Sequence, residues 1–210
     1  MGIIMKKFIV IVVLAIFSFT TKAQDKSLSK TDISFGLKGG LNFAFITGDD
    51  TDNFDGRAAF HVGGIVEIPI SEKFSFQPEI LYSSQGDKMT EEGMDISFKL
   101  DYLNLPLIAK YYLTEGFSLE AGPQIGFLLS SKVEAEGISI DIKDVMKGID
   151  FGLNFGVGYK LENNLFFGAR YNLGVANIVE NNGSILDVEI DAGNTKNHNE
   201  VFQLSVGYFF

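Results

Sequence analysis

The chain has 210 residues, of which 46% are hydrophobic, with 23 glycines, no cysteine and a formal net charge of −10. This length suits one domain, and the missing cysteine excludes a disulfide framework, thiolate metal sites, cysteine nucleophiles and lipid attachment through cysteine. The acidic balance argues against nucleic acid as a partner, because phosphate binding needs a basic surface.

The first segment has the pattern of an export signal. Lys6 and Lys7 precede the run 8–19, which is apolar apart from one serine, and small residues at 21–23 suit a signal peptidase, leaving Gln24 as the mature start. The alternative is an N-terminal anchor helix, but the run is shorter than the roughly 20 residues that a membrane helix needs. Cleavage would take the formal net charge from −10 to −13. The sequence thus predicts three parts: a signal peptide, a short periplasmic segment and one barrel domain, at 1–23, 24–32 and 33–210.

The rest of the chain alternates apolar and polar residues, and such a period of two is typical of strands with one apolar face. The pattern predicts eight antiparallel strands, at 33–45, 60–70, 74–82, 103–113, 117–129, 149–161, 165–173 and 202–210. The apolar parity before Tyr102 is opposite to that after Leu103, which predicts a β-bulge near Tyr102.

The predicted connections alternate in length. Short ones fall at 71–72, 114–116 and 162–164, and long ones at 47–57, 86–95, 130–148 and 175–200. With both chain ends on the short-turn side, this is the layout of an up-and-down transmembrane β-barrel with short periplasmic turns and longer extracellular loops.

A soluble barrel with an apolar interior would alternate in the same way. Three observations favour lipid outside. The apolar face carries no charge, aromatic residues gather near both strand ends, and the polar face is crowded with glycine, as a narrow lumen requires. We therefore expect the protein in the outer membrane, with lipid against its apolar face.

Two further features resemble known proteins. The final strand ends on Tyr208 and Phe210, and a terminal aromatic residue there is similar to the signal that the outer-membrane assembly machinery recognises in small β-barrel proteins of Gram-negative bacteria. The segment 102–111, YLNLPLIAKY, is similar to the Tyr-Leu-x-x-Pro-Leu-x-x-Lys-Tyr motif of the PorT-like barrel family, and 76–82 also resembles that family. The resemblance implies a barrel fold, an outer-membrane location and a possible association with protein secretion.

The polar face holds four cationic and four anionic side chains, which would share one lumen. They are Lys38, Lys110, Lys160 and Arg170 against Glu67, Glu79, Glu120 and Asp150. Because isolated charges in a tight space are costly and mutual pairing offsets that cost, we expect an ion-pair network that fills and rigidifies the barrel. A gated ion path or a polar binding site is the alternative.

Other polar residues give weaker signals. His61 could pair with Glu67 or Asp150, but no nucleophile stands recognisably beside it, so a structural role is favoured; His198 is expected in a solvated loop. Four aspartates in the first long loop, Asp49, Asp50, Asp52 and Asp55, could hold Ca²⁺, although they fail the EF-hand spacing, and a solvated acidic loop is the simpler interpretation. We predict no metal, cofactor or catalytic residue.

The third and fourth long connections contain alternation of their own, at 133–142 and 185–190. These segments could extend the barrel wall beyond the membrane, where an exposed edge could take up a strand of a partner protein; simple stiffening of the hairpin is the alternative. The sequence as a whole favours a non-enzymatic outer-membrane barrel that serves envelope structure, surface interaction or a secretion-related scaffold. A small transport or ligand-binding barrel is the alternative.

Overall fold

A computed structural model describes the barrel region of the chain. The described residues are 33–49, 51, 55–91, 94–180, 182–185, 188–191 and 196–210, so the predicted signal peptide and periplasmic segment lie outside them. No helix among these residues is long and apolar enough to cross a membrane.

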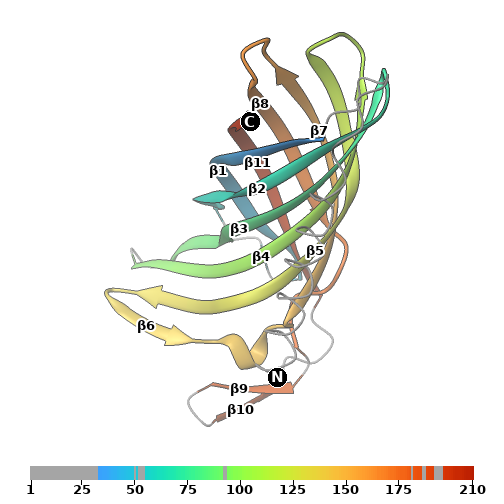
Figure 1. Ribbon diagram of the computed structural model, residues 1–210. Helices are drawn as coiled ribbons and strands as arrows, with labels where there is room; N and C mark the ends of the chain where they lie inside the picture. Colours follow the sequence, from blue (N-terminus) through green and yellow to red (C-terminus); the bar gives the residue numbers. More distant parts are fainter. Residues whose placement is uncertain are drawn as a thin grey trace. The chain divides into compact units, whose positions relative to one another are not determined.

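Eight strands form a closed antiparallel ring (Figure 1). Their bounds are β1 Ser34–Gly48, β2 Arg57–Ser71, β3 Phe74–Glu91, β4 Met94–Tyr112, β5 Phe117–Ala135, β7 Ile149–Lys160, β8 Leu165–Gly174 and β11 Asn197–Phe209. Each strand pairs with the next along this series, and the ring closes where β1 pairs with β11, for example Leu41 opposite Leu204. The predicted all-β, eight-stranded up-and-down barrel is confirmed.

Side chains alternate between the two faces of this wall. Outward side chains are apolar and exposed, such as Val62 and Phe155, each 52% exposed, whereas their chain neighbours His61 and Asn154 are 1% exposed and point into the lumen. A large exposed apolar surface on every strand of a barrel is the pattern of a protein that faces lipid. The soluble alternative would place these apolar side chains inside.

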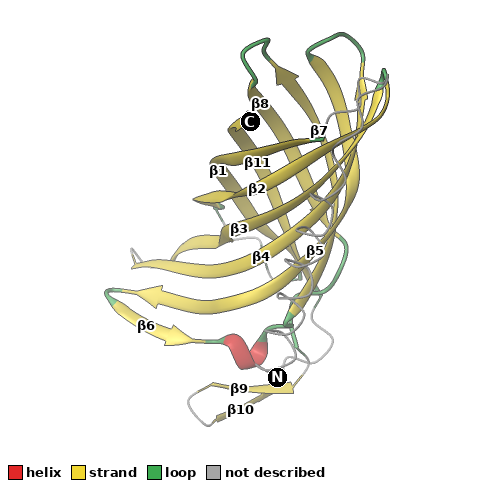
Figure 2. Cartoon of the chain, viewed as in Figure 1, coloured by secondary structure: helices red, strands yellow, loops and turns green. Residues whose placement is uncertain are grey.

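Several strands run farther than predicted, and β3, β4 and β5 are extended the most. β3, β4 and β5 have 18, 19 and 19 residues, against 12 and 10 in β7 and β8. The expected long connection at 86–95 is therefore wrong, because β3 continues to Glu91 and β4 starts at Met94. Most of 130–148 is also ordered, into the end of β5, the strand β6 Ile138–Asp141 and the 3-10 helix η2 Lys143–Val145 (Figure 2).

The extensions form a projecting wall, which we define as β3 from residue 84, β4 to residue 101, β5 from residue 130, and β6. Met89 lies opposite Ile96, Phe98 opposite Val133, and Ala135 opposite Ile138, so apolar side chains share the face that continues the lumen. The strands β9 Asn182–Ile185 and β10 Val188–Asp191 form a separate hairpin in the last long connection.

The apolar face changes sides at the foot of the projecting wall. Below it the outward face is apolar and meets lipid, and above it the outward face carries Lys88, Lys99, Lys132 and Glu134 and suits water. This change explains the reversed parity before Tyr102. The predicted bulge is also present, since the β4–β5 ladder shifts between Asp101 and Tyr102, but its extra residue is Leu129 of β5.

Candidate functional site

The lumen contains a network of six charged side chains, one from each of six strands. They are Lys38 of β1, Glu67 of β2, Glu79 of β3, Lys110 of β4, Glu120 of β5 and Arg170 of β8, and each is at most 8% exposed. The inward parity of each strand places them there. With three cations and three carboxylates, the network carries no net charge.

Glu79 and Arg170 form the centre of this network. Arg170 donates to both carboxylate oxygens of Glu79, at 3.0 and 2.9 Å, and also to Oε2 of Glu120 at 2.7 Å. Lys38 Nζ donates to Glu79 Oε2 at 2.8 Å. Two-pronged contacts of a guanidinium with a carboxylate are among the strongest charge-assisted hydrogen bonds.

Lys110 links the remaining carboxylates. Its Nζ lies 3.4 Å from Glu67 and 3.8 Å from Glu120, and Tyr112 donates its hydroxyl to Glu67 at 2.5 Å. Gln77 accepts from Lys110 at 3.2 Å and donates to Glu79 at 2.7 Å, so it joins the two halves. Tyr112 and Gln77 were not in the predicted network, although Gln77 has the inward parity that would have revealed it.

Asp150 and Lys160 do not join this network, contrary to the prediction. They lie near opposite ends of β7 and therefore at different heights in the barrel. Lys160 Nζ sits 4.4 Å from the ring centre of Phe209, whereas Asp150 is 6% exposed and forms a hydrogen bond with Asn199. Among the described residues no cation pairs with Asp150, and its Oδ1 has no hydrogen-bond partner. The position of these residues in the alternating pattern correctly placed their side chains on the lumenal face. It could not predict their height along the barrel axis.

His61 pairs with partners other than the predicted Glu67 or Asp150. Asn42 donates its amide to the carbonyl oxygens of Phe60 and Ser84, at 3.1 and 2.7 Å, and thereby turns its own oxygen toward His61 Nδ1 at 2.8 Å. In the neutral ring this contact places the proton on Nδ1, so Nε2 accepts from the Ser205 hydroxyl at 2.9 Å. These bonds have the polarity of a serine–histidine pair with an orienting amide, but His61 is only 1% exposed.

Apolar clusters lie toward both ends of the lumen. Ile65, Phe166 and Phe209 pack together at the short-turn end. At the loop end the cluster consists of Ile46, Leu100, Tyr102, Leu128 and Ile178. Ile65 and Phe166 are apolar residues at inward positions of strands whose inward residues are mostly polar or glycine, and the short-turn cluster accounts for them. The short-turn cluster reaches the charged network, since Lys110 Nζ lies 5.8 Å from the ring centre of Phe209.

The carboxylate of Asp87, which the sequence did not identify as important, fixes the two ends of the first long connection. Asp87 is fully buried and accepts from the backbone N–H groups of Ile46 at 2.6 Å and Gly56 at 2.7 Å. Two of the four aspartates considered for Ca²⁺, Asp50 and Asp52, lie outside the described residues. Of the other two, Asp49 accepts a hydrogen bond from the Lys196 N–H at 2.9 Å, and Asp55 donates its backbone N–H to the Lys88 carbonyl at 2.8 Å. Within the described part, no three acidic or histidine side chains converge as a metal site requires.

The expectation for His198 is wrong. It lies in β11 and its ring contacts the Ala176 carbonyl oxygen at 3.0 Å, so it is half-buried and not in a solvated loop. The predicted assembly residues Tyr208 and Phe210 both face outward, 45% and 73% exposed, with their ring centres 5.5 Å apart.

The outward face of the projecting wall is lined with ion pairs. Lys99 donates to Glu134, and Lys88 lies 3.0 Å from Asp95. The hydrogen bond from Lys99 lowers the pKa of Glu134, and those from Lys88 and Thr90 lower the pKa of Asp95. Both carboxylates therefore remain charged in neutral water. This face is built for solvent.

Comparisons with known proteins agree with this geometry. Neisserial surface protein A from Neisseria superimposes with a TM-score of 0.55 at 16% identity, over 85% of this chain and 99% of that one. A major outer membrane protein from Thermus thermophilus gives 0.50 at 13% identity, again over 85% and 99%. At such identities the likeness concerns the fold alone.

A search of curated proteins finds no match to the chain. A family model described as an outer membrane protein beta-barrel domain matches residues 22–180. That match covers most of the chain and agrees with the ring of eight strands and their lipid-facing surface. The chain therefore belongs to the outer membrane protein beta-barrel domain family.

Proposed function

We propose that this protein is a non-enzymatic scaffold of the outer membrane, in which a closed barrel anchors the projecting wall at the cell surface. The observation that carries the proposal is the filled lumen. Six paired charges, each at most 8% exposed, occupy the middle, with an apolar cluster toward either end. Ordered ion pairs packed in this way rigidify a barrel and oppose the passage of solutes.

The same observation disfavours the alternative of a small transport barrel. For a solute to pass, the contact between Glu79 and Arg170 would have to break. The apolar cluster toward each end of the lumen would also have to open. An enzymatic role is disfavoured for a related reason, because the ring of His61 is almost completely buried and a substrate would have to reach Ser205 through the packed lumen.

Conductance tests the closed lumen. Purified protein in planar lipid bilayers should give no steady conductance above the bare bilayer. A double variant, Glu79→Ala with Arg170→Ala, serves as a positive comparison, since it removes the central contact and should give measurable current if it folds. Steady large conductance of the wild type would contradict the proposal.

The resemblance of 102–111 to PorT-like barrels supports a secretion-related role as the finer version of this proposal. Crosslinking in intact cells through a photoreactive residue in place of Ser139, on the projecting wall, would identify a neighbour. A secretion component among the crosslinked proteins would support the finer version. Crosslinks to lipopolysaccharide alone would contradict it.

Export through the signal peptide belongs to the same proposal. The mature protein from an outer-membrane fraction should begin at Gln24, with 24–32 as a short periplasmic segment before β1. N-terminal sequencing provides the measurement. Retention of residues 1–23 would favour the anchor helix instead.

A further inference from the structure

The projecting wall has two outer edges, and they differ. The β3 edge is partly covered, because two of its carbonyl oxygens already accept hydrogen bonds. Asp55 donates its N–H to the Lys88 carbonyl at 2.8 Å, and Arg57 donates its side chain to the Gln85 carbonyl at 2.5 Å. The β6 edge is different. β6 pairs with β5 on one side, and no described strand pairs with its other side. Proteins usually protect such edges, because unpaired backbone groups invite another strand.

The register identifies the free backbone groups. Ile142 donates its N–H to the Ser131 carbonyl at 3.0 Å, so residues of the same parity in β6, Ile138 and Ile140, direct their backbone toward β5. Ser139 and Asp141 therefore direct their N–H and C=O groups away from the sheet. No described backbone group outside the β5–β6 pair bonds to the backbone of either residue.

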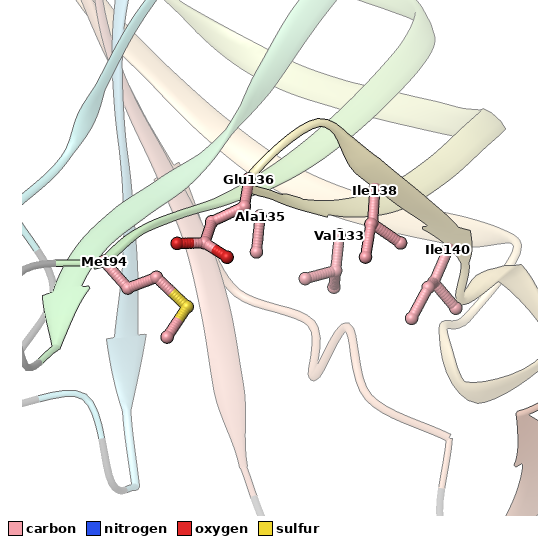
Figure 3. A pocket seen from close by; sticks show the side chains of 6 residues that line it. All are labelled: Met94, Val133, Ala135, Glu136, Ile138 and Ile140. Atoms are coloured by element: carbon pink, nitrogen blue, oxygen red, sulfur yellow. The ribbon is translucent and has the colours of Figure 1, made fainter.

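An apolar groove lies beside this edge. Its volume is about 210 Å³, and its lining consists of Met94, Val133, Ala135, Glu136, Ile138 and Ile140 (Figure 3). Ile138 is 66% exposed and Met94 40% exposed, which leaves apolar side chains open to water above the membrane. Exposed apolar patches of this kind mark binding surfaces.

The charge at the groove is negative. Glu136 lies in the turn that joins β5 to β6, its side chain lines the groove, and no described cation lies within ion-pair distance of it. Lys143 is held elsewhere, because its Nζ donates to the Leu129 carbonyl at 2.8 Å and so satisfies the bulge. The groove thus complements an apolar segment that carries a basic side chain.

We propose that β6 and its groove bind an extended segment of a partner protein, which adds as a strand to the free edge. Its apolar side chains would enter the groove, and a basic side chain would meet Glu136. This inference rests on the proposed surface role of the barrel and names the chemistry of the partner. Strand addition supplies affinity through the backbone and specificity through alternate side chains.

Symmetry argues against a second copy as the occupant. Two identical antiparallel strands are related by a two-fold axis perpendicular to their sheet. The projecting wall continues the barrel wall, so this axis would lie in the membrane plane. The second barrel would then lie inverted above the axis, in an apposed membrane, so two copies in one membrane cannot pair in this way. An acyl chain is also a poorer occupant, because it would fill the groove and leave the edge groups of Ser139 and Asp141 without partners.

The test uses the whole protein in zwitterionic nanodiscs and a fluorescent peptide, Lys-Val-Lys-Val-Lys-Val-Lys. Binding is followed by fluorescence anisotropy, with empty nanodiscs as the blank. The peptide should bind the wild type at least tenfold more tightly than its Glu-for-Lys counterpart. Equal binding of both peptides, or no binding above the blank, would overturn the proposal.

Three variants locate the site. Ser139→Pro removes an outward N–H without removing a bond to β5, and Ile138→Gln removes an apolar side chain from the groove without changing its charge; each should weaken binding about tenfold or more. Glu136→Gln should weaken binding less and reduce its salt dependence. Lys132→Gln, on the opposite face of β5, is the matched control and should bind as the wild type does.

Other outcomes remain distinguishable. A shift in migration between unheated and heated samples confirms that each variant folds. Self-association of the wild type that Ser139→Pro abolishes would identify a second copy and overturn the inference. If the barrel proves conductive while the peptide still binds at β6, the closed scaffold fails and the strand site stands. If the barrel is closed and the peptide fails to bind, only the strand site falls.

Discussion

At the scale of single residues, the lumen contains both charges that are paired and charges that stay outside the ion-pair network. Glu79 accepts from Lys38 and Arg170, both of them almost fully buried. Removing one partner from such a set leaves the others charged and buried, which typically costs about 3–5 kcal/mol, more than the pair itself contributes.

The substitution Glu79→Gln should therefore lower the free energy of unfolding by about 3–5 kcal/mol. Urea titration of protein refolded into detergent micelles, scored by migration on unheated gels, provides the measurement. The control is Glu136→Gln, at an exposed carboxylate, which should change stability by less than about 0.5 kcal/mol. Equal stability of the two variants would mean that the network does not hold the barrel.

Asp150 should behave in the opposite way. It is a buried carboxylate without a described cationic partner, and burying an unpaired charge is costly. Asp150→Asn keeps the shape and removes the charge, so it should leave the urea midpoint unchanged or raise it. A loss of stability as large as that of Glu79→Gln would show that Asp150 has a strong partner in solution.

At the scale of strands, glycine marks the places where two backbones come close. A Cβ on Gly63 would lie 2.0 Å from the Ile80 carbonyl oxygen and 2.8 Å from the Leu81 Cα. On the adjacent Gly64, the nearest atom would be Ile80 Cγ2 at 3.8 Å, an ordinary contact. The requirement for glycine thus comes from the neighbouring strand as well as from the narrow lumen.

Gly63→Ala should therefore destabilise the barrel by about 1–3 kcal/mol, as overpacking does. Gly64→Ala should be close to neutral, and this neighbour in the same strand is a matched control. The same urea titration compares them. If the two alanines have equal effects, close backbone approach at Gly63 is not what requires glycine.

At the scale of the whole molecule, stability and assembly place different demands on the last residue. Phe210 is 73% exposed and faces outward, so its side chain adds little to packing within the barrel. Its predicted role is as a signal to the assembly machinery, together with Tyr208.

Phe210→Ala should consequently lower the amount of protein in the outer membrane several-fold, measured by blotting of membrane fractions. The purified variant should refold in detergent with nearly the stability of the wild type. Phe35→Ala, at another outward aromatic residue that is 42% exposed, is the control and should assemble normally. Equal loss for both variants would indicate a general effect of lipid-facing aromatics.

The closed lumen and the projecting wall belong to the same scale. Alternation predicted eight strands and the inward position of all six networked charges, since parity assigns each side chain to one face. It could not predict which charges meet, because that depends on the stagger between strands. Lys38 and Glu79 are 41 residues apart, and Arg170 and Glu79 are 91 apart, yet they meet at one level.

The sequence by itself determined the strand number, the faces of the wall and the short turns, because each depends on a local period of two and on local turn residues. The tertiary structure decided the heights of Asp150 and Lys160, the partners of His61 and the extent of β3, β4 and β5. The physical reason is that apolar side chains face lipid within the membrane and turn inward above it, so the same alternation changes its meaning at that boundary. Only the assembled barrel shows where the boundary falls, and with it the free edge of β6.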